Sequence, residues 1–198
     1  MTTYPLAPWP LHGSMWVTLF RVAEARDGRR PGLYAAALVD YQEPSPLTYH
    51  ELLVARALPP RTPRLTSTIT DIWVDSAASR AGGRELWAIP KEICTAEQEQ
   101  VGSQTRWRVE VGGAPVAAAR FTRMRLPLPS PRLPLRLRAD QPPIDDRPQG
   151  CVVTAGGHAR VTPCRGRWQI DPDGPIAFLT GARQLASLHL ETFDLTFG

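Results

Sequence analysis

Lysine is nearly absent from this chain. The sequence has 23 basic residues, and because Lys91 is the one lysine among them, the other 22 are arginines. Arginine carries a positive charge as well as lysine does, but it does not lose its proton in a protein and cannot act as a nucleophile. A lysine can do so once its amine is neutral. Lys91 is therefore a candidate reactive amine, and the alternative is an ordinary solvated surface charge.

Long apolar runs, paired cysteines and phosphate-binding loops are missing as well. No stretch approaches the roughly 20 apolar residues of a membrane-spanning helix, so we expect no membrane partner. Residues 1–10 lack the basic and apolar regions of a secretory signal, and a cytoplasmic location follows by default. The 3 cysteines show neither disulfide nor metal-type spacing, and no metal site is predicted. Without a glycine-rich phosphate loop, we expect no cofactor.

Helical periodicity is scarce, whereas short segments typical of strands are frequent. The 21 prolines and 15 glycines divide the chain into many such segments, and residues 105–111 alternate apolar and polar side chains as a half-buried strand does. These features predict one domain over residues 1–198, mainly β, built as an antiparallel barrel or sandwich with a few short helices. The expected strands are 15–23, 32–41, 49–55, 67–74, 105–111, 116–125, 151–161, 166–170 and 191–197, and the expected helices are 76–82 and 181–188.

Residues 126–148 are rich in proline and arginine. A basic arm for nucleic acid has such a composition, but no aromatic side chains accompany the arginines to stack on bases. We therefore expect no nucleic-acid partner and interpret the segment as an extended, proline-stiffened connection, with arginines in water and leucines packed. His158, after two glycines, is predicted to be a turn or hairpin residue. His189, between two leucines, is predicted to be a hydrogen-bonded histidine at the edge of the core and not a ligand.

Three segments stand out as motifs. They are Tyr4-Pro5-Leu6-Ala7-Pro8-Trp9, then Tyr49-His50-Glu51, and then the segment from Asp75 through Gly83-Arg84-Glu85-Leu86-Trp87-Ala88-Ile89-Pro90-Lys91. Together they resemble the acetoacetate decarboxylase-like family, in its Tyr-x-Glu, its Gly-Arg-Glu and its aromatic-x-x-Pro-Lys. The resemblance is firm over residues 75–92, looser before them and faint after residue 102. It implies a β-barrel or cone, a lyase activity and a homo-oligomer.

The resemblance also implies that Lys91 reacts with a carbonyl carbon to form a Schiff base. Decarboxylation, aldol-type cleavage or condensation, and dehydration all pass through the resulting iminium. The amine must be neutral to attack, yet with a pKa of about 10.4 only about 0.04% of free lysine is neutral at pH 7. The apolar run that includes Trp87 and Ile89 is expected to form a dry pocket wall that lowers the pKa of Lys91.

Other residues take roles from the same resemblance. Glu51 corresponds to a pocket glutamate that relays a proton or orients the substrate, and its alternative is a surface carboxylate at the start of a strand. Tyr49 is expected in the pocket beside it. Arg84 and Glu85 correspond to the family's Gly-Arg-Glu and are interpreted as a structural ion pair.

The sequence departs from the family pattern at three places. Glu92 stands where the decarboxylases have a second lysine, and an anion there raises the pKa of Lys91 unless a strand sends it to the opposite face. Ser14 stands in the pocket where an arginine is expected, and a glutamate is replaced within residues 35–37. The leading hypothesis is therefore a Schiff-base lyase acting on a small keto acid or related carbonyl compound. The alternative is a non-catalytic protein that binds a small ligand in the same cavity.

Overall fold

The computed structural model describes residues 3–58, 66–124 and 130–198, and in these ranges the chain is mainly β, as expected. One α-helix and a short 3-10 helix accompany the strands. The elements in chain order are β1 (Trp9–Val22), β2 (Gly32–Tyr41), β3 (Tyr49–Ala57), β4 (Thr66–Val74), α1 (Ala77–Trp87), β5 (Lys91–Ile93), β6 (Thr95–Val101), β7 (Gln104–Val111), β8 (Ala114–Arg123), β9 (Arg132–Gln141), β10 (Cys151–Ile170), η1 (Ala177–Leu179) and β11 (Arg183–Phe197).

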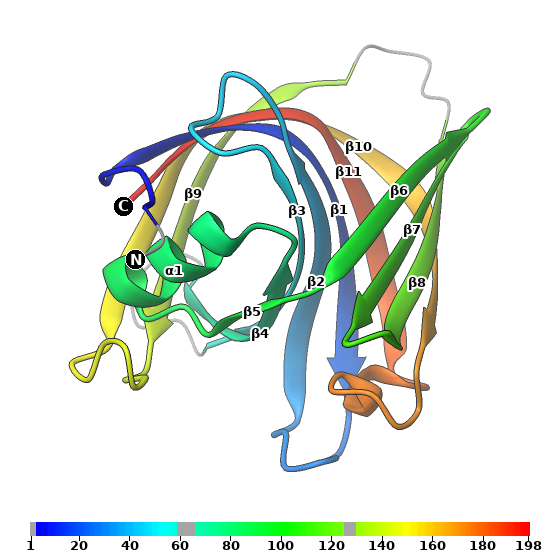
Figure 1. The fold of residues 1–198 in the computed structure, drawn as a ribbon. Coiled ribbons are helices and arrows are strands. Elements are labelled where there is room, and N and C mark those ends of the chain that lie inside the picture. Colours follow the sequence, from blue (N-terminus) through cyan, green and yellow to red (C-terminus); the bar gives the residue numbers. More distant parts are fainter. Residues whose placement is uncertain (1–2, 59–65, 125–129) are drawn as a thin grey trace.

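Seven strands close into a ring (Figure 1). The order is β11, β1, β2, β3, β4, β9 and β10, and β10 pairs back with β11. Neighbours in the ring are antiparallel except β4 and β9, which meet in parallel over two residue pairs. The side-chain amide of Gln141 in β9 strengthens this short parallel seam. Its oxygen accepts a hydrogen bond from the backbone N–H of Ile69 in β4, and its nitrogen donates to the carbonyl of the same residue. The expected barrel is confirmed, with one parallel seam that the antiparallel prediction did not include.

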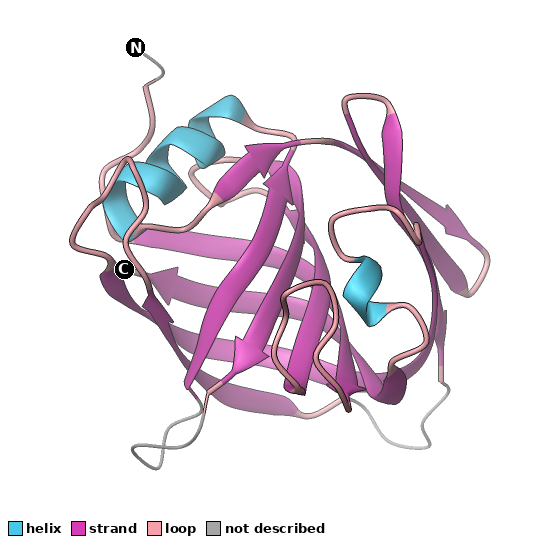
Figure 2. Ribbon diagram, turned by 90° about the horizontal axis from the view of Figure 1, so that it is seen from below, coloured by secondary structure: helices cyan, strands magenta, loops and turns pink. Residues whose placement is uncertain are grey.

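A three-stranded flap made of β6, β7 and β8 lies outside the ring. It is joined to the ring by β10, which pairs with β9 and β11 and then, over residues 164–170, with β8. Figure 2 shows α1 on the left and the flap on the right, on different sides of the molecule.

Two hydrophobic cores lie on opposite faces of the same strands. Because successive side chains of a strand point to opposite faces, one set of residues in β1 to β4 faces the ring interior and α1, and the other faces the flap. The inner core includes Trp9, Leu11, Val39, Ile72, Trp87, Ile89 and Phe193. The outer core includes Trp16, Phe20, Leu38, Leu52, Trp107 and Phe121.

Helix α1 lies across one opening of the ring (Figure 1). It begins after Ser76, whose hydroxyl accepts a hydrogen bond from the backbone N–H of Ser79, and it ends at Ala88 in a left-handed conformation with φ of 54°. The helix was expected to stop at Gly82, but it continues to Trp87. Both glycines are needed inside it, because an added Cβ at Gly82 would lie 2.7 Å from the ring of Trp9, and one at Gly83 would lie 2.6 Å from Cδ of Lys91.

Several expected boundaries are wrong because distant strands decide them. Residues 183–188, expected in a helix, belong to β11, which pairs with β1 on one side and with β10 on the other. Pairing with β11 also starts β1 at Trp9 instead of residue 15. His158 lies within β10 and not in a turn, because β10 runs unbroken from Cys151 to Ile170. Strand β6 was not expected at all.

The proline- and arginine-rich segment contains a strand and is not only a connection. Strand β9 pairs with β10 along its whole length, from Arg132 to Gln141. Its leucines do not all pack, since Leu133 and Leu137 are each 42% exposed. Residues 126–129, and residue 125 of the strand expected at 116–125, lie outside the described residues. In the described parts of the chain, no helix has the length and apolar character needed to cross a membrane.

Candidate active site

Lys91 lies at the start of the short strand β5, where the chain returns from α1 to the sheet. The strand pairs in parallel with β4 and places Lys91 beside Ile72 of the inner core. The side chain is only 5% exposed and packs against α1 at Gly83. Because Pro90 cannot continue the helix, the chain turns there and aims Lys91 into the ring.

The amine of Lys91 has three hydrogen-bond acceptors around it. Its Nζ atom donates to Oε2 of Glu51 at 2.8 Å, to Oγ of Ser79 at 2.9 Å and to the hydroxyl of Tyr49 at 3.3 Å. An ammonium has three N–H donors, so all of them are used. The geometry is that of a satisfied, buried ammonium.

Glu51 is the anion of this site and is itself buried, with 2% of its surface exposed. Its second oxygen, Oε1, accepts a hydrogen bond from the hydroxyl of Tyr41 at 3.2 Å. The rings of Tyr41 and Tyr49 stack with their centroids 4.4 Å apart. Burial raises the pKa of both phenols, so both stay protonated and hold the carboxylate and the amine in place.

The pKa of Lys91 is raised in the free protein. Burial by itself lowers it, but the carboxylate of Glu51 and then the phenol of Tyr49 oppose burial and together outweigh it. The expectation of a lowered pKa is therefore wrong for the free protein. The apolar residues before Lys91 are buried in the inner core, as expected, but the amine itself contacts the carboxylate of Glu51. The amine can therefore act as a nucleophile only after the ammonium has lost a proton.

The other expected pocket residues divide between the two faces of the sheet. Trp87 and Ile89 are buried in the inner core, and the ring of Trp87 meets those of Trp9 at 4.7 Å and Phe197 at 4.8 Å, edge to face. Ser14 lies elsewhere and donates its hydroxyl hydrogen to the carbonyl of Glu191.

The strand register fixes this separation. Ser14 pairs with Asp40, whereas Glu51 pairs with Val39, the neighbour of Asp40. Because neighbours on a strand point to opposite faces, Ser14 faces the outer core and Glu51 faces the ring interior. The structure therefore does not bring Ser14 together with Lys91.

Arg84 and Glu85 do not pair with each other, which corrects their interpretation as one ion pair. Neighbouring residues on a helix point in different directions. Arg84 donates to Glu92 at 2.8 Å, to the carbonyl of Lys91 at 3.3 Å and also to Asp146, while Glu85 accepts from Tyr4 at 2.6 Å. Both residues therefore fix α1 to neighbouring segments. Glu92 binds Arg80 and Arg84 and points away from the Lys91 amine, as alternation along a strand predicts.

Two site residues, Ser79 and Tyr41, were missed by the sequence analysis. Ser79 belongs to the small-residue segment that precedes the Gly-Arg-Glu, and its only signal was its position in a predicted helix. Tyr41 was placed at the end of a predicted strand, but the pairing that sets it beside Tyr49 is a tertiary contact. Neither residue type marks a site without that contact.

Comparison with known proteins shows the family of this chain. The family model described as acetoacetate decarboxylase matches residues 20–144. No significant match was found among curated protein sequences.

Among solved structures, an acetoacetate decarboxylase from Legionella pneumophila is 16% identical with a TM-score of 0.70, covering 99% of this chain and 87% of that one. The enduracididine biosynthesis enzyme MppR in complex with pyruvate is 18% identical with a TM-score of 0.67, covering 100% and 90%. An acetoacetate decarboxylase-like enzyme from Sphingomonas wittichii is 14% identical with a TM-score of 0.67, covering 97% and 91%. These likenesses show the fold, and the family model, which spans more than half of the chain, shows the family. The chain belongs to the acetoacetate decarboxylase family of lyases.

Proposed function

We propose that this protein is a Schiff-base-forming lyase in which Lys91 condenses with a small keto acid or a related carbonyl compound. The observation that carries the proposal is the contact of the one lysine in the chain with Glu51, at 2.8 Å, in the buried interior of the ring. Membership of the family supports it, and so does the structure of MppR with pyruvate, a small keto acid.

The proposed reaction begins with a proton transfer. Glu51 takes one proton from the ammonium of Lys91, and the neutral amine attacks the carbonyl carbon. Glu51 then returns the proton to the hydroxyl of the addition product, which leaves as water. The iminium that remains accepts the electron pair of an adjacent bond when that bond breaks. Decarboxylation, aldol-type chemistry and dehydration share these steps.

The neighbouring hydroxyl groups have positioning roles in this scheme. Tyr41 holds one oxygen of Glu51 and leaves the other to face Lys91. Ser79 and Tyr49 hold the amine from two further directions. Hydrogen-bonding groups that are fixed in this way need no reorganisation when charge develops during the reaction.

The second candidate is a protein that binds a small ligand in the same interior without turnover. The raised pKa of Lys91 favours it, because an amine that Glu51 holds as an ammonium does not attack a carbonyl group. A binding protein does not need the neutral form of Lys91, whereas the lyase does.

Reduction by borohydride separates the two candidates. Each member of a carbonyl panel (pyruvate, acetoacetate, acetone and a small aldehyde) is mixed with the protein, reduced, and examined by intact mass and peptide mapping. The lyase requires an adduct on Lys91 that is missing from Lys91→Arg, which keeps the charge but not the nucleophile. The α-amino group, with a pKa of about 7.7–8.0, is the competing site that the mapping must separate. Binding of these compounds without an adduct on Lys91 would leave the binding protein as the correct candidate.

A further inference from the structure

A cavity lies outside the ring, between the outer face of β1 and β2 and the flap. Its volume is about 590 Å³, within the range of small-molecule sites. Ser14 and Trp16 of β1, Asp40 of β2 and Thr105 of β7 are among its lining residues. Neither Lys91 nor Glu51 is, because both face the ring interior. The site proposed for catalysis and this cavity are therefore on opposite sides of one sheet.

The lining of the cavity is rich in uncharged hydrogen-bonding groups that are not fully used. Gln98 and Ser103 make no side-chain hydrogen bond to any residue that the structure describes. A ring nitrogen of His189, Nε2, is buried and has no partner in the same described ranges. The side chain of Gln98 is half-buried and that of Ser103 is exposed, so the polar groups of both are accessible to a ligand in the cavity.

The charged side chains of the cavity already have partners within the protein. Arg123 pairs with Glu191 at 2.7 Å. Asp40 accepts a hydrogen bond from Gln42 at 2.6 Å and lies 3.7 Å from Nε2 of His50. Burial lowers the pKa of His189 to about 4, so its ring is neutral near pH 7. A charged ligand would have to compete with these existing partners.

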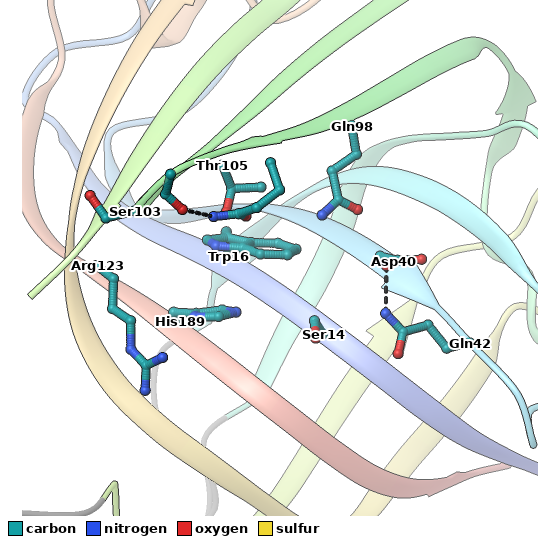
Figure 3. A pocket seen from close by; sticks show the side chains of 11 residues that line it. Ser14, Trp16, Asp40, Gln42, Gln98, Ser103, Thr105, Arg123 and His189 are labelled. Atoms are coloured by element: carbon teal, nitrogen blue, oxygen red, sulfur yellow. Dashed lines mark hydrogen bonds between the residues drawn. The ribbon is translucent and has the colours of Figure 1, made fainter.

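The floor of the cavity is aromatic. The rings of Trp16 and His189 stack with centroids 4.5 Å apart and an angle of 11° between their planes. Figure 3 shows this pair between Arg123 on the left and Asp40 with Gln42 on the right. An aromatic floor surrounded by amide and hydroxyl groups fits a compact molecule with C–H groups on one face and hydroxyl groups at its edge.

We propose that this cavity is a second binding site and that it takes a neutral polyhydroxyl ligand of about the size of a monosaccharide. A hydroxyl group both donates and accepts, and it can therefore satisfy the amide of Gln98 and the hydroxyl of Ser103 alike. A neutral ligand is favoured because Arg123 and Asp40 already have partners within the protein, which a charged ligand would have to displace. The site is independent of the chemistry proposed for Lys91.

Ligand-observed NMR and calorimetry test this proposal with D-glucose, D-ribose and myo-inositol at millimolar concentration. We expect at least one of them to bind the wild type and Lys91→Arg equally, which separates this site from the ring interior. Gln98→Leu and Asp40→Asn should each weaken binding about tenfold, the effect of losing one or two hydrogen bonds to a ligand. Gln184→Leu, the same change at an exposed position of β11 that does not line the cavity, should leave binding unchanged.

Two other outcomes would overturn the proposal. Failure of all three compounds to bind, or binding that neither cavity variant weakens, would remove the site. Tighter binding of D-glucosamine or D-glucuronate than of D-glucose would show that the cavity selects a charge and not a neutral molecule.

Discussion

The Nζ atom of Lys91 lies 2.8 Å from Oε2 of Glu51, and the two side chains are almost fully buried. Each group makes the burial of the other tolerable, because a lone charge in the protein interior is strongly disfavoured. The same contact decides the protonation state of the amine and therefore the first step of any chemistry at this site.

Glu51→Gln is expected to lower the pKa of Lys91. Without the carboxylate, burial acts unopposed and favours the neutral amine. The chain has one lysine, so lysine-labelled protein gives one side-chain NMR signal whose titration reports this pKa directly. Glu92→Gln is the matched control, because Glu92 is close in sequence but binds Arg80 and Arg84 instead of the amine. An unchanged titration in Glu51→Gln would show that the ion pair does not set the charge of Lys91.

Gly83→Ala is expected to displace Lys91 and abolish its borohydride adduct. The new Cβ would lie 2.6 Å from Cδ of Lys91, and overpacking of this kind costs about 1–3 kcal/mol of stability.

The control for this substitution is Gly82→Ala, one residue earlier on the same helix. Its Cβ would meet Trp9 at 2.7 Å and not Lys91. We expect both variants to unfold at lower urea concentration and only Gly83→Ala to lose the adduct. Equal trapping in the two variants would contradict the placement of Lys91 against α1.

Release of carbon dioxide from acetoacetate is expected to be weak or absent. The side chains that bind the Lys91 amine are Glu51, Ser79 and Tyr49, none of which is a cation, and Ser14 faces the other side of the sheet. Loss of one charge-assisted contact to a substrate carboxylate removes roughly 1.5–3 kcal/mol, a loss of about ten- to hundredfold. Fast carbon dioxide release by the wild type at neutral pH would contradict this prediction.

Stability should fall as the pH drops from 6.5 toward 4 because of His189. Burial lowers its pKa in the folded protein from 6.5 to about 4, so in this range the unfolded chain binds a proton that the folded protein does not. Protonation therefore favours unfolding, by at most about 3 kcal/mol at the acid end of the range.

Urea unfolding at pH 7 and pH 4.5 measures this effect. We expect His189→Gln, which cannot be protonated, to lose less stability than the wild type between the two pH values. His158→Gln, a change at an exposed histidine, should behave like the wild type. If His189→Gln and the wild type lose equal stability, His189 is not the group responsible.

The sequence by itself determined the candidate reactive residue, the family and the fold class. Lys91 is identified by its rarity and by the Pro-Lys that follows Trp87, both of which are local properties of the chain. Alternating side chains and frequent turn residues likewise predict strands wherever a strand has one buried face. Glu51 was found because its neighbour Tyr49 belongs to the same short motif.

Only the tertiary structure decided what surrounds the amine. The closure of the ring, the extension of β11 and the face on which Ser14 lies all depend on strand register, and a shift of one residue moves a side chain to the other face. The direction of the pKa of Lys91 depended on Glu51 and Tyr49, which lie about 40 positions away in the chain and reach the amine through the pairing of β3 with β4 and of β4 with β5. Local patterns carry no information on such pairings, since any strand of matching length and polarity can satisfy them.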